Sequence, residues 1–240
     1  MTIAAALQTV RARIAEAALR AGRAPESVTL VAVSKTFPPE VIQEAIDAGQ
    51  RDFGENRVEE ALPKMAALSD AGVCWHMVGH VQSRKARDVA GRFALVHSVD
   101  SLRLARKLND HTPSEQRQSV LLECNVSGEA SKAGFPLKDW ARDKAVFEAF
   151  AEEVAQILVL PRLRVMGLMT MAPIVESPDQ ARPFFASLRA LRDALRVRFP
   201  DQPPETFSQL SMGMTDDFEA AIAEGATLVR IGRAIFGARQ

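Results

Sequence analysis

The sequence predicts an α/β protein, a (β/α)8 TIM barrel with an extra N-terminal helix, formed by residues 1–240 as a single domain. Apolar runs rich in β-branched residues alternate along the chain with amphipathic helical patterns, which is typical of parallel strands joined by crossover helices. Eight such runs are present, the number that closes a barrel. An open doubly wound sheet is the alternative, and the number of units favours the barrel.

The first predicted element is a helix over residues 3–18, because its apolar residues are spaced by four and three positions. The run 28–36 follows and has the composition of a buried strand. Pro38 and Pro39 are expected to open the next helix, and Gly49 to close it. The other strands are expected at 51–56, 73–80, 93–100, 119–127, 163–171, 206–213 and 227–236.

Composition narrows the class of protein. Lys and Arg number 30, as do Asp and Glu, and this balance argues against a broad nucleic-acid or membrane surface. No run approaches 18 apolar residues and the first residues lack a signal-peptide pattern, so we expect a cytoplasmic protein. Cys74 and Cys124 are expected to be reduced residues of the core. No long apolar stripe is evident, which favours a monomer.

Lys35 is the first candidate for chemistry. It stands at the carboxyl end of the predicted strand 28–36, where barrels form their sites, and it shares a face with Val31 and Val33. Apolar surroundings disfavour the charged form of a lysine and leave a nucleophilic amine. A lysine that reaches from a strand end into water is the alternative.

A second candidate region follows the seventh and eighth predicted strands, where barrels often bind phosphate. Ser211 and Gly213 precede a helix start, and Gly232 and Arg233 follow the last strand. A glycine lets backbone amides approach an anion closely, and a helix N-terminus favours negative charge. A simple capped turn is the alternative, and the two acids at 216–217 would repel a phosphate if they faced it.

Arg230 lies within an apolar strand, on the same parity as Gly232, so it either faces the phosphate loop or forms a salt bridge at the rim. Cys74, His76 and His80 also share one parity. Four strand residues span about 13 Å, whereas zinc ligands lie within about 2.3 Å of one ion. We therefore expect no metal site, and the two histidines are expected to form hydrogen bonds near the barrel mouth.

With these segments assembled, the chain resembles the pyridoxal phosphate homeostasis protein family over nearly its whole length. The resemblance rests on several blocks in one order. They are VAVSKT (31–36), DFGENRVEE (52–60), WHMVGHVQSRK (75–85), NVSGEASKAGF (125–135), GLMTMAP (167–173), LSMGMTDDFEAAIAEG (210–225) and VRIGRAIFG (229–237).

The resemblance implies a barrel like the N-terminal domain of alanine racemase that holds pyridoxal 5'-phosphate (PLP) as a Schiff base on Lys35. It implies that Asn56 and Met169 line the pocket and that Arg230 faces the pyridine nitrogen. The phosphate would be received by the segment Ser211, Met212 and Gly213 together with Gly232 and Arg233. Phe37 stands where many members have a second lysine, and Arg233 where many have threonine. His80 stands where some relatives have proline.

The resemblance further implies a protein that maintains PLP balance with little or no turnover, and PLP-dependent apo-enzymes are candidate partners. An arginine at the pyridine nitrogen keeps that nitrogen unprotonated and weakens the ring as an electron sink. A PLP-dependent amino-acid racemase is the alternative. A two-base racemase needs a second proton carrier, and the chain has no tyrosine. A cofactor-free Schiff-base aldolase is a third hypothesis, which predicts a colourless protein.

Overall fold

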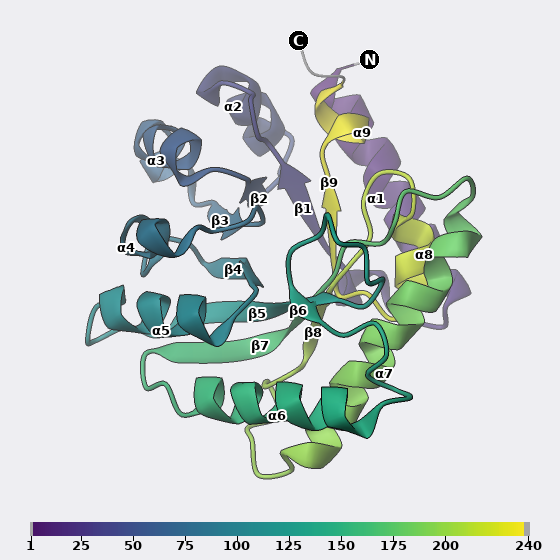
Figure 1. The fold of residues 1–240 in the computed structure, drawn as a ribbon. Helices are drawn as coiled ribbons and strands as arrows, with labels where there is room; N and C mark the ends of the chain where they lie inside the picture. Colours follow the sequence, from purple (N-terminus) through teal and green to yellow (C-terminus); the bar gives the residue numbers. More distant parts are fainter. Residues whose placement is uncertain (1, 238–240) are drawn as a thin grey trace.

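A computed structural model describes residues 2–237. Eight parallel strands form a closed barrel in the order β4-β3-β2-β1-β9-β8-β7-β5, and pairing of β4 with β5 closes it (Figure 1). The barrel strands are β1 (Thr29–Val33), β2 (Asp52–Glu55), β3 (Cys74–Met77), β4 (Leu95–Val99), β5 (Gln118–Asn125), β7 (Leu163–Met169), β8 (Gln209–Ser211) and β9 (Leu228–Ile231). The predicted barrel is confirmed, and every predicted run contains a barrel strand. The run 227–236 is wrong beyond Ile231, because the chain turns at Gly232 and residues Arg233–Phe236 form a helix.

One strand was not predicted. β6 (Phe135–Pro136) pairs with the end of β5 and lies outside the closed ring. Its two residues are too few for an alternating pattern, and Pro136 has no backbone N–H to donate. β6 belongs to the long connection between β5 and the next helix.

Helices surround the barrel (Figure 1). They are α1 (Ile3–Arg20), α2 (Pro39–Asp47), α3 (Val58–Ala67), α4 (Ala86–Val89), α5 (Leu102–His111), α6 (Lys144–Leu158), α7 (Arg182–Arg198), α8 (Phe218–Ala223) and α9 (Arg233–Phe236). Short 3-10 turns are η1 (Pro25–Ser27), η2 (Ser69–Ala71), η3 (Ser83–Lys85) and η4 (Pro178–Ala181). The predicted N-terminal helix is α1, which packs against α8 and α9. Gly49 follows α2 at φ +82°, as the predicted left-handed cap requires.

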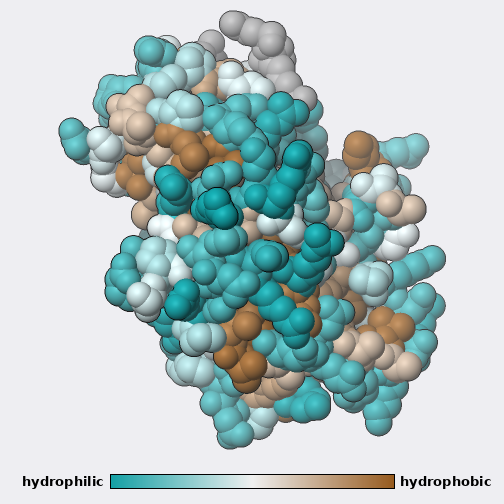
Figure 2. Space-filling view, turned by 60° about the vertical axis from the view of Figure 1, so that its left-hand side comes forward, coloured by the Kyte–Doolittle hydropathy of each residue, from teal (hydrophilic) through white to brown (hydrophobic). Residues whose placement is uncertain are grey.

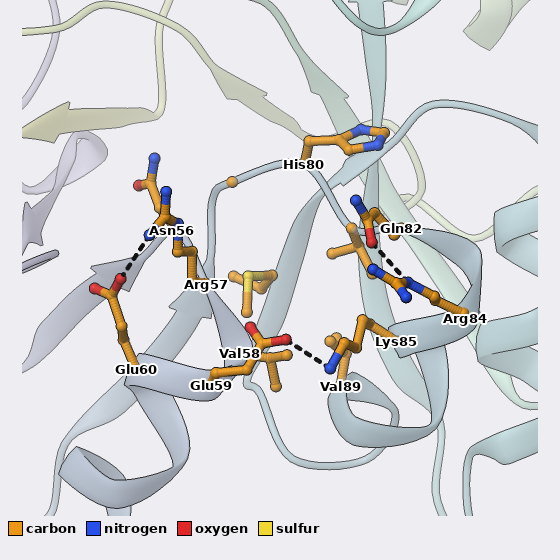
Figure 3. A pocket seen from close by; sticks show the side chains of 13 residues that line it. Asn56, Arg57, Val58, Glu59, Glu60, His80, Gln82, Arg84, Lys85 and Val89 are labelled. Carbon is orange, nitrogen blue, oxygen red and sulfur yellow. Dashed lines mark hydrogen bonds and ion pairs between the residues drawn. The ribbon is translucent and has the colours of Figure 1, made fainter.

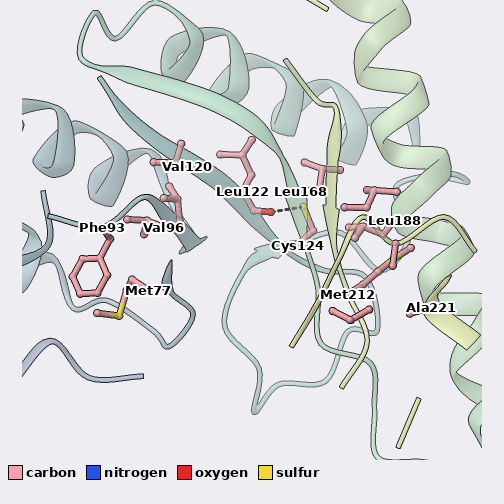
Figure 4. Close-up of a cluster of buried hydrophobic side chains, with 14 of the residues drawn as sticks. Met77, Phe93, Val96, Val120, Leu122, Cys124, Leu168, Leu188, Met212 and Ala221 are labelled. Carbon is pink, nitrogen blue, oxygen red and sulfur yellow. Dashed lines mark hydrogen bonds between the residues drawn. The ribbon is translucent and has the colours of Figure 1, made fainter. Parts of the chain in front are cut away.

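Two apolar layers hold the fold together. The larger lies between the outer surface of the barrel and the helices, and Figure 4 shows part of it, including Leu168, Leu188 and Ala221. The smaller fills the barrel interior and consists of Val31, Leu95, Leu121, Met169 and Leu228. Strand side chains alternate between these layers, so the interior members identify the inward parity of each strand.

The surface fits a protein with its apolar residues mostly inside. The face brought forward in Figure 2 is mostly hydrophilic, with hydrophobic residues in small separate groups. Among residues 2–237, no helix is both long and apolar enough to cross a membrane. The expectation that both cysteines are core residues is correct for Cys124 and wrong for Cys74, which is exposed because it opens β3 at the open end of the strand.

Candidate functional site

The predicted site residues lie on five neighbouring strands. In barrel order, Asn56 follows β2, Lys35 follows β1, Arg230 lies in β9, Ser211 ends β8 and Met169 ends β7. Because all these strands are parallel, the residues gather at one end of the barrel. This is the carboxyl end, where (β/α)8 proteins form their sites.

Lys35 is half-buried two residues beyond β1, and it continues the inward parity of Val31. The next residue, Thr36, has φ +68°. A β-branched residue is a clear outlier in this left-handed region, and such strain costs about 1–3 kcal/mol. The strained residue thus directly follows Lys35 in the same turn, and such strain is common at functional sites.

A buried polar cluster supports this turn from the outer side of the barrel. Ser34 Oγ donates to Glu55 Oε1 at 2.6 Å, and Lys64 Nζ reaches the same oxygen at 2.9 Å. Lys64 also donates to the carbonyl oxygen of Ser34 at 3.0 Å. Burial raises the pKa of Glu55, against the opposing hydrogen bonds from Ser34 and Lys64. These contacts tie the residue before Lys35 to β2 and α3.

The turn after β8 packs closely against α8 and requires a glycine there. Gly213 has φ +93°, and a Cβ there would lie 2.6 Å from the Ala221 Cβ. Asp217 Oδ1 accepts the amide of Met214 at 2.6 Å, so one of the two acids serves as an internal cap. The Met212 side chain packs among the outer-layer residues and not in the barrel interior (Figure 4). Any contact of Met212 with a ligand at the mouth would therefore be through its backbone.

The turn after β9 lies beside the first strand. Gly232 precedes α9, and a Cβ there would lie 3.0 Å from the carbonyl oxygen of Val33. The Arg233 guanidinium pairs with Asp216 at 2.6 Å, and both side chains are exposed. The side chain of Arg233 is therefore paired with the turn after β8, and its backbone lies at the start of α9.

Arg230 is buried, at 5% exposure, and reaches across two strands. Its guanidinium donates to Ser211 Oγ at 2.6 Å and to the carbonyl oxygen of Thr170 at 3.0 Å. Burial lowers its pKa to about 10, opposed by the carboxyl groups of Glu123 and Asp217. Arg230 thus stays charged at neutral pH and is held in place below the mouth. The alternative for Arg230, a salt bridge at the barrel rim, is not formed within residues 2–237, where its guanidinium contacts Ser211 and Thr170.

Glu123 faces the same interior from β5. It is 3% exposed and pairs in register with Met169, and its Oε2 has no hydrogen-bond partner among the described residues. Burial raises its pKa to about 7, with a further increase from Asp100 and an opposing effect from Arg230. The carboxyl group therefore titrates in the physiological range beside the guanidinium.

Two histidines extend the polar interior. His76 contacts Asp52 through Nε2 at 3.1 Å and His97 through Nδ1 at 2.9 Å. The other ring nitrogen of His97 lies 2.8 Å from Ser211 Oγ. The expectation of hydrogen bonds near the mouth fits His80, which pairs with Asp100 at 3.1 Å. It does not fit His76, whose ring lies deeper and contacts the first residue of β2.

A cavity of about 610 Å3 adjoins this end of the barrel at Asn56 (Figure 3). Its charged rim is internally paired: Arg57 contacts Glu60 at 3.3 Å, and Lys85 contacts Glu59 at 2.7 Å. The cavity lies between the β2–α3 and β3–α4 connections, at the side of the mouth.

Comparison with known proteins identifies the family. The model of the family described as "Alanine racemase, N-terminal domain" matches residues 6–240. A Pseudomonas aeruginosa relative named "Pyridoxal phosphate homeostasis protein" is 46% identical, over 99% of this chain and 96% of its own. The relative of that name from Escherichia coli K12 is 47% identical, over 99% and 97%. The chain belongs to the pyridoxal phosphate homeostasis protein family.

A solved structure of this family agrees with the fold. PipY of Synechococcus elongatus, described with PLP bound, is 35% identical to this chain. The superposition has a TM-score of 0.81 and covers 98% of this chain and 100% of PipY. The family assignment and the barrel therefore rest on independent comparisons of sequence and structure.

Several residues of the site were not predicted from the sequence. Lys64, His97 and Glu123 were not singled out, although each is a polar residue within an otherwise apolar pattern. A charged or polar residue at an inward position of a strand must find a partner, and that is the signal available for His97 and Glu123. Their partners come from distant parts of the chain and could not be read from spacing.

Proposed function

We propose that the protein binds PLP through a Schiff base on Lys35 and acts in PLP homeostasis with little or no turnover. The observation that carries this proposal is the arrangement of three groups on adjacent strands: the Lys35 amine after β1, Arg230 in β9 and the glycine turn at Gly213 after β8. The names of the relatives and the PLP-bound state of PipY support it.

The residues present fit the chemistry of PLP. An amine is required for the aldehyde, and Lys35 supplies one at a strained, half-buried turn. Backbone amides suit a phosphate, and Gly213 and Gly232 let two neighbouring turns follow paths on which a Cβ would meet α8 or β1. In this proposal Asn56 and Met169 line the space between, and Ser211, Met212 and Arg233 contribute to the phosphate side.

When bound, PLP supplies an electrophilic carbon and an electron-withdrawing ring. Arg230 has no acceptor group, so beside the pyridine nitrogen it would donate a hydrogen bond and keep that nitrogen unprotonated. This would weaken electron withdrawal by the ring, which supports a role with little carbanion chemistry. The chain has no tyrosine to act as a second proton carrier. Both features favour a carrier of PLP over a racemase.

The proposal extends to the setting in which the protein acts. We place it in the cytoplasm as a monomer that supplies PLP to PLP-dependent apo-enzymes. Among residues 2–237, the large exposed apolar residues belong to different helices and loops: Leu19, Val159, Ile174, Val197 and Met214. Scattered apolar residues are normal on a monomer surface.

Titration with PLP tests the proposal. The unmodified protein should develop a visible absorption band that saturates at one PLP per chain, and Lys35→Ala should lose it. Lys107→Ala, at an exposed position of α5, is the matched control and should keep the band. An unchanged band in Lys35→Ala would overturn the assignment of the lysine. A racemase assay on the same samples should give no lysine-dependent turnover.

A further inference from the structure

A continuous chain of hydrogen bonds crosses the barrel interior beneath the proposed PLP site. It runs from Asp52 to His76 at 3.1 Å, from His76 to His97 at 2.9 Å, and from His97 to Ser211 at 2.8 Å. Arg230 joins it by donating to Ser211 Oγ at 2.6 Å. The five residues come from β2, β3, β4, β8 and β9.

The charged ends fix the direction of every bond when His76 is neutral. A carboxylate only accepts, so His76 Nε2–H donates to Asp52 and His76 Nδ1 must accept. His97 then donates from Nε2, and its Nδ1 accepts the Ser211 hydroxyl proton. The Ser211 oxygen consequently directs its lone pairs to Arg230, which only donates.

The environment of His97 favours this neutral arrangement. Burial lowers the pKa of His97 well below its usual value of 6.5, and the neighbouring His76 and Arg230 lower it further. Two further charged groups act on Arg230: the carboxyl groups of Glu123 and Asp217, which raise its pKa against the effect of burial. Geometry and electrostatics therefore agree on a neutral His97 that accepts at Nδ1.

The far end of the chain of hydrogen bonds is accessible to water. The Asp52 side chain is 31% exposed, and Asp52 lines a cavity of about 450 Å3 at the amino-terminal end of the strands. Arg11, Glu26 and Arg51 also line this cavity, and the thiol of Cys74 lies within the electrostatic influence of Asp52. Asp52 thus connects solvent at one end of the barrel with Arg230 near the other.

We propose that His76 and His97 are positioning residues that couple Asp52 to Arg230, an inference that rests on the proposed function. By fixing the Ser211 hydroxyl, they hold the Arg230 guanidinium in the orientation that faces the pyridine ring. The ring environment of PLP thereby responds to Asp52 from the opposite end of the barrel.

The first test needs no cofactor. The chain contains four histidines, so long-range 1H–15N spectra of protein labelled on histidine nitrogen resolve each ring. The hydrogen-bond geometry predicts that His76 and His97 both carry hydrogen at Nε2 and accept at Nδ1. A proton on Nδ1 of either ring would overturn the proposed direction. Because PLP is absent, this result does not depend on the proposed function.

The second test uses variants and the visible spectrum of the PLP-bound protein. His97→Leu removes both ring contacts and should weaken PLP binding about tenfold, the effect of roughly one buried hydrogen bond. His97→Gln offers an acceptor to Ser211 and a donor to His76, so it should stay within about twofold of the unmodified protein. Equal losses in both variants would show a packing role only and would overturn the proposal.

A remote variant keeps the test decisive if His97→Leu does not fold. Asp52→Asn replaces the fixed acceptor by an amide that also donates, and should weaken PLP binding about two- to threefold and shift the pH profile of the visible band. Glu26→Gln lines the same cavity outside the hydrogen-bond chain and is the matched control. Identical profiles for Asp52→Asn and Glu26→Gln would contradict the coupling. Failure of PLP to bind at all would instead refute the proposed function.

Discussion

Replacing Glu123 by glutamine should change the stability of the protein relative to the unmodified chain, and the change should favour the variant more at high pH than at low pH. Glu123 is almost fully buried in the barrel interior, with one carboxylate oxygen lacking a partner among the described residues. Burial raises its pKa from 4.5 to about 7. One pKa unit corresponds to about 1.4 kcal/mol, so ionisation of this group costs the folded state about 3 kcal/mol.

The direction of the pH dependence of stability follows from the number of protons that each state binds. Between the two pKa values the folded protein holds more protons than the unfolded chain, so the free energy of unfolding falls as the pH rises from 4.5 towards about 7. Above that range the loss is complete and the contribution is level. Glu123→Gln does not titrate, and it should therefore lack this decline.

Urea unfolding of the PLP-free proteins at pH 5 and pH 8 measures the effect. The stability difference between Glu123→Gln and the unmodified protein should change in favour of the variant by about 2–3 kcal/mol between these pH values. Glu152→Gln, at an exposed position of α6, controls for the loss of one carboxyl group. A difference that is the same at both pH values would refute the reasoning that burial controls Glu123.

Three further variants test the support of the site. Lys64→Met leaves the buried Glu55 carboxylate without its cation, which should lower the free energy of unfolding in urea by about 3 kcal/mol. A decrease under about 1 kcal/mol would contradict a stabilising buried ion pair. Gly213→Ala should lose about 2 kcal/mol and weaken PLP binding, whereas Gly22→Ala has positive φ without a collision and should lose less. Arg230→Gln should weaken PLP binding about tenfold in an absorption titration, and unchanged affinity and spectrum would count against its place at the ring.

Much of the fold follows from local sequence. The runs 28–36, 119–127 and 163–171 are apolar and β-branched enough to predict their strands, and the alternation with helices predicts the parallel barrel. The run 206–213 yields only the short strand β8, Gln209–Ser211, because Phe207 at φ +58° cannot continue an extended strand. Strand existence was therefore more predictable than strand length.

The strand-end residues of the site could be predicted from the sequence, but the tertiary partners of its buried polar groups could not. Lys35 and Gly213 each follow a strand, and parallel strands bring their carboxyl ends together, so their proximity could be expected. The partners of Glu55 and His97 could not, because Lys64 and Ser211 reach them only after the helices and strands have packed. Strand parity places such polar residues inside or outside the barrel, but tertiary packing selects the groups they meet.

Reduction of the PLP-bound protein with borohydride, followed by mass mapping of its peptides, tests the central claim most directly. A Schiff base becomes a stable secondary amine on reduction, so the lysine that carried PLP keeps the added mass. The account predicts that this mass lies on the peptide containing Lys35. Modification of another lysine, with Lys35 unmodified, would contradict it.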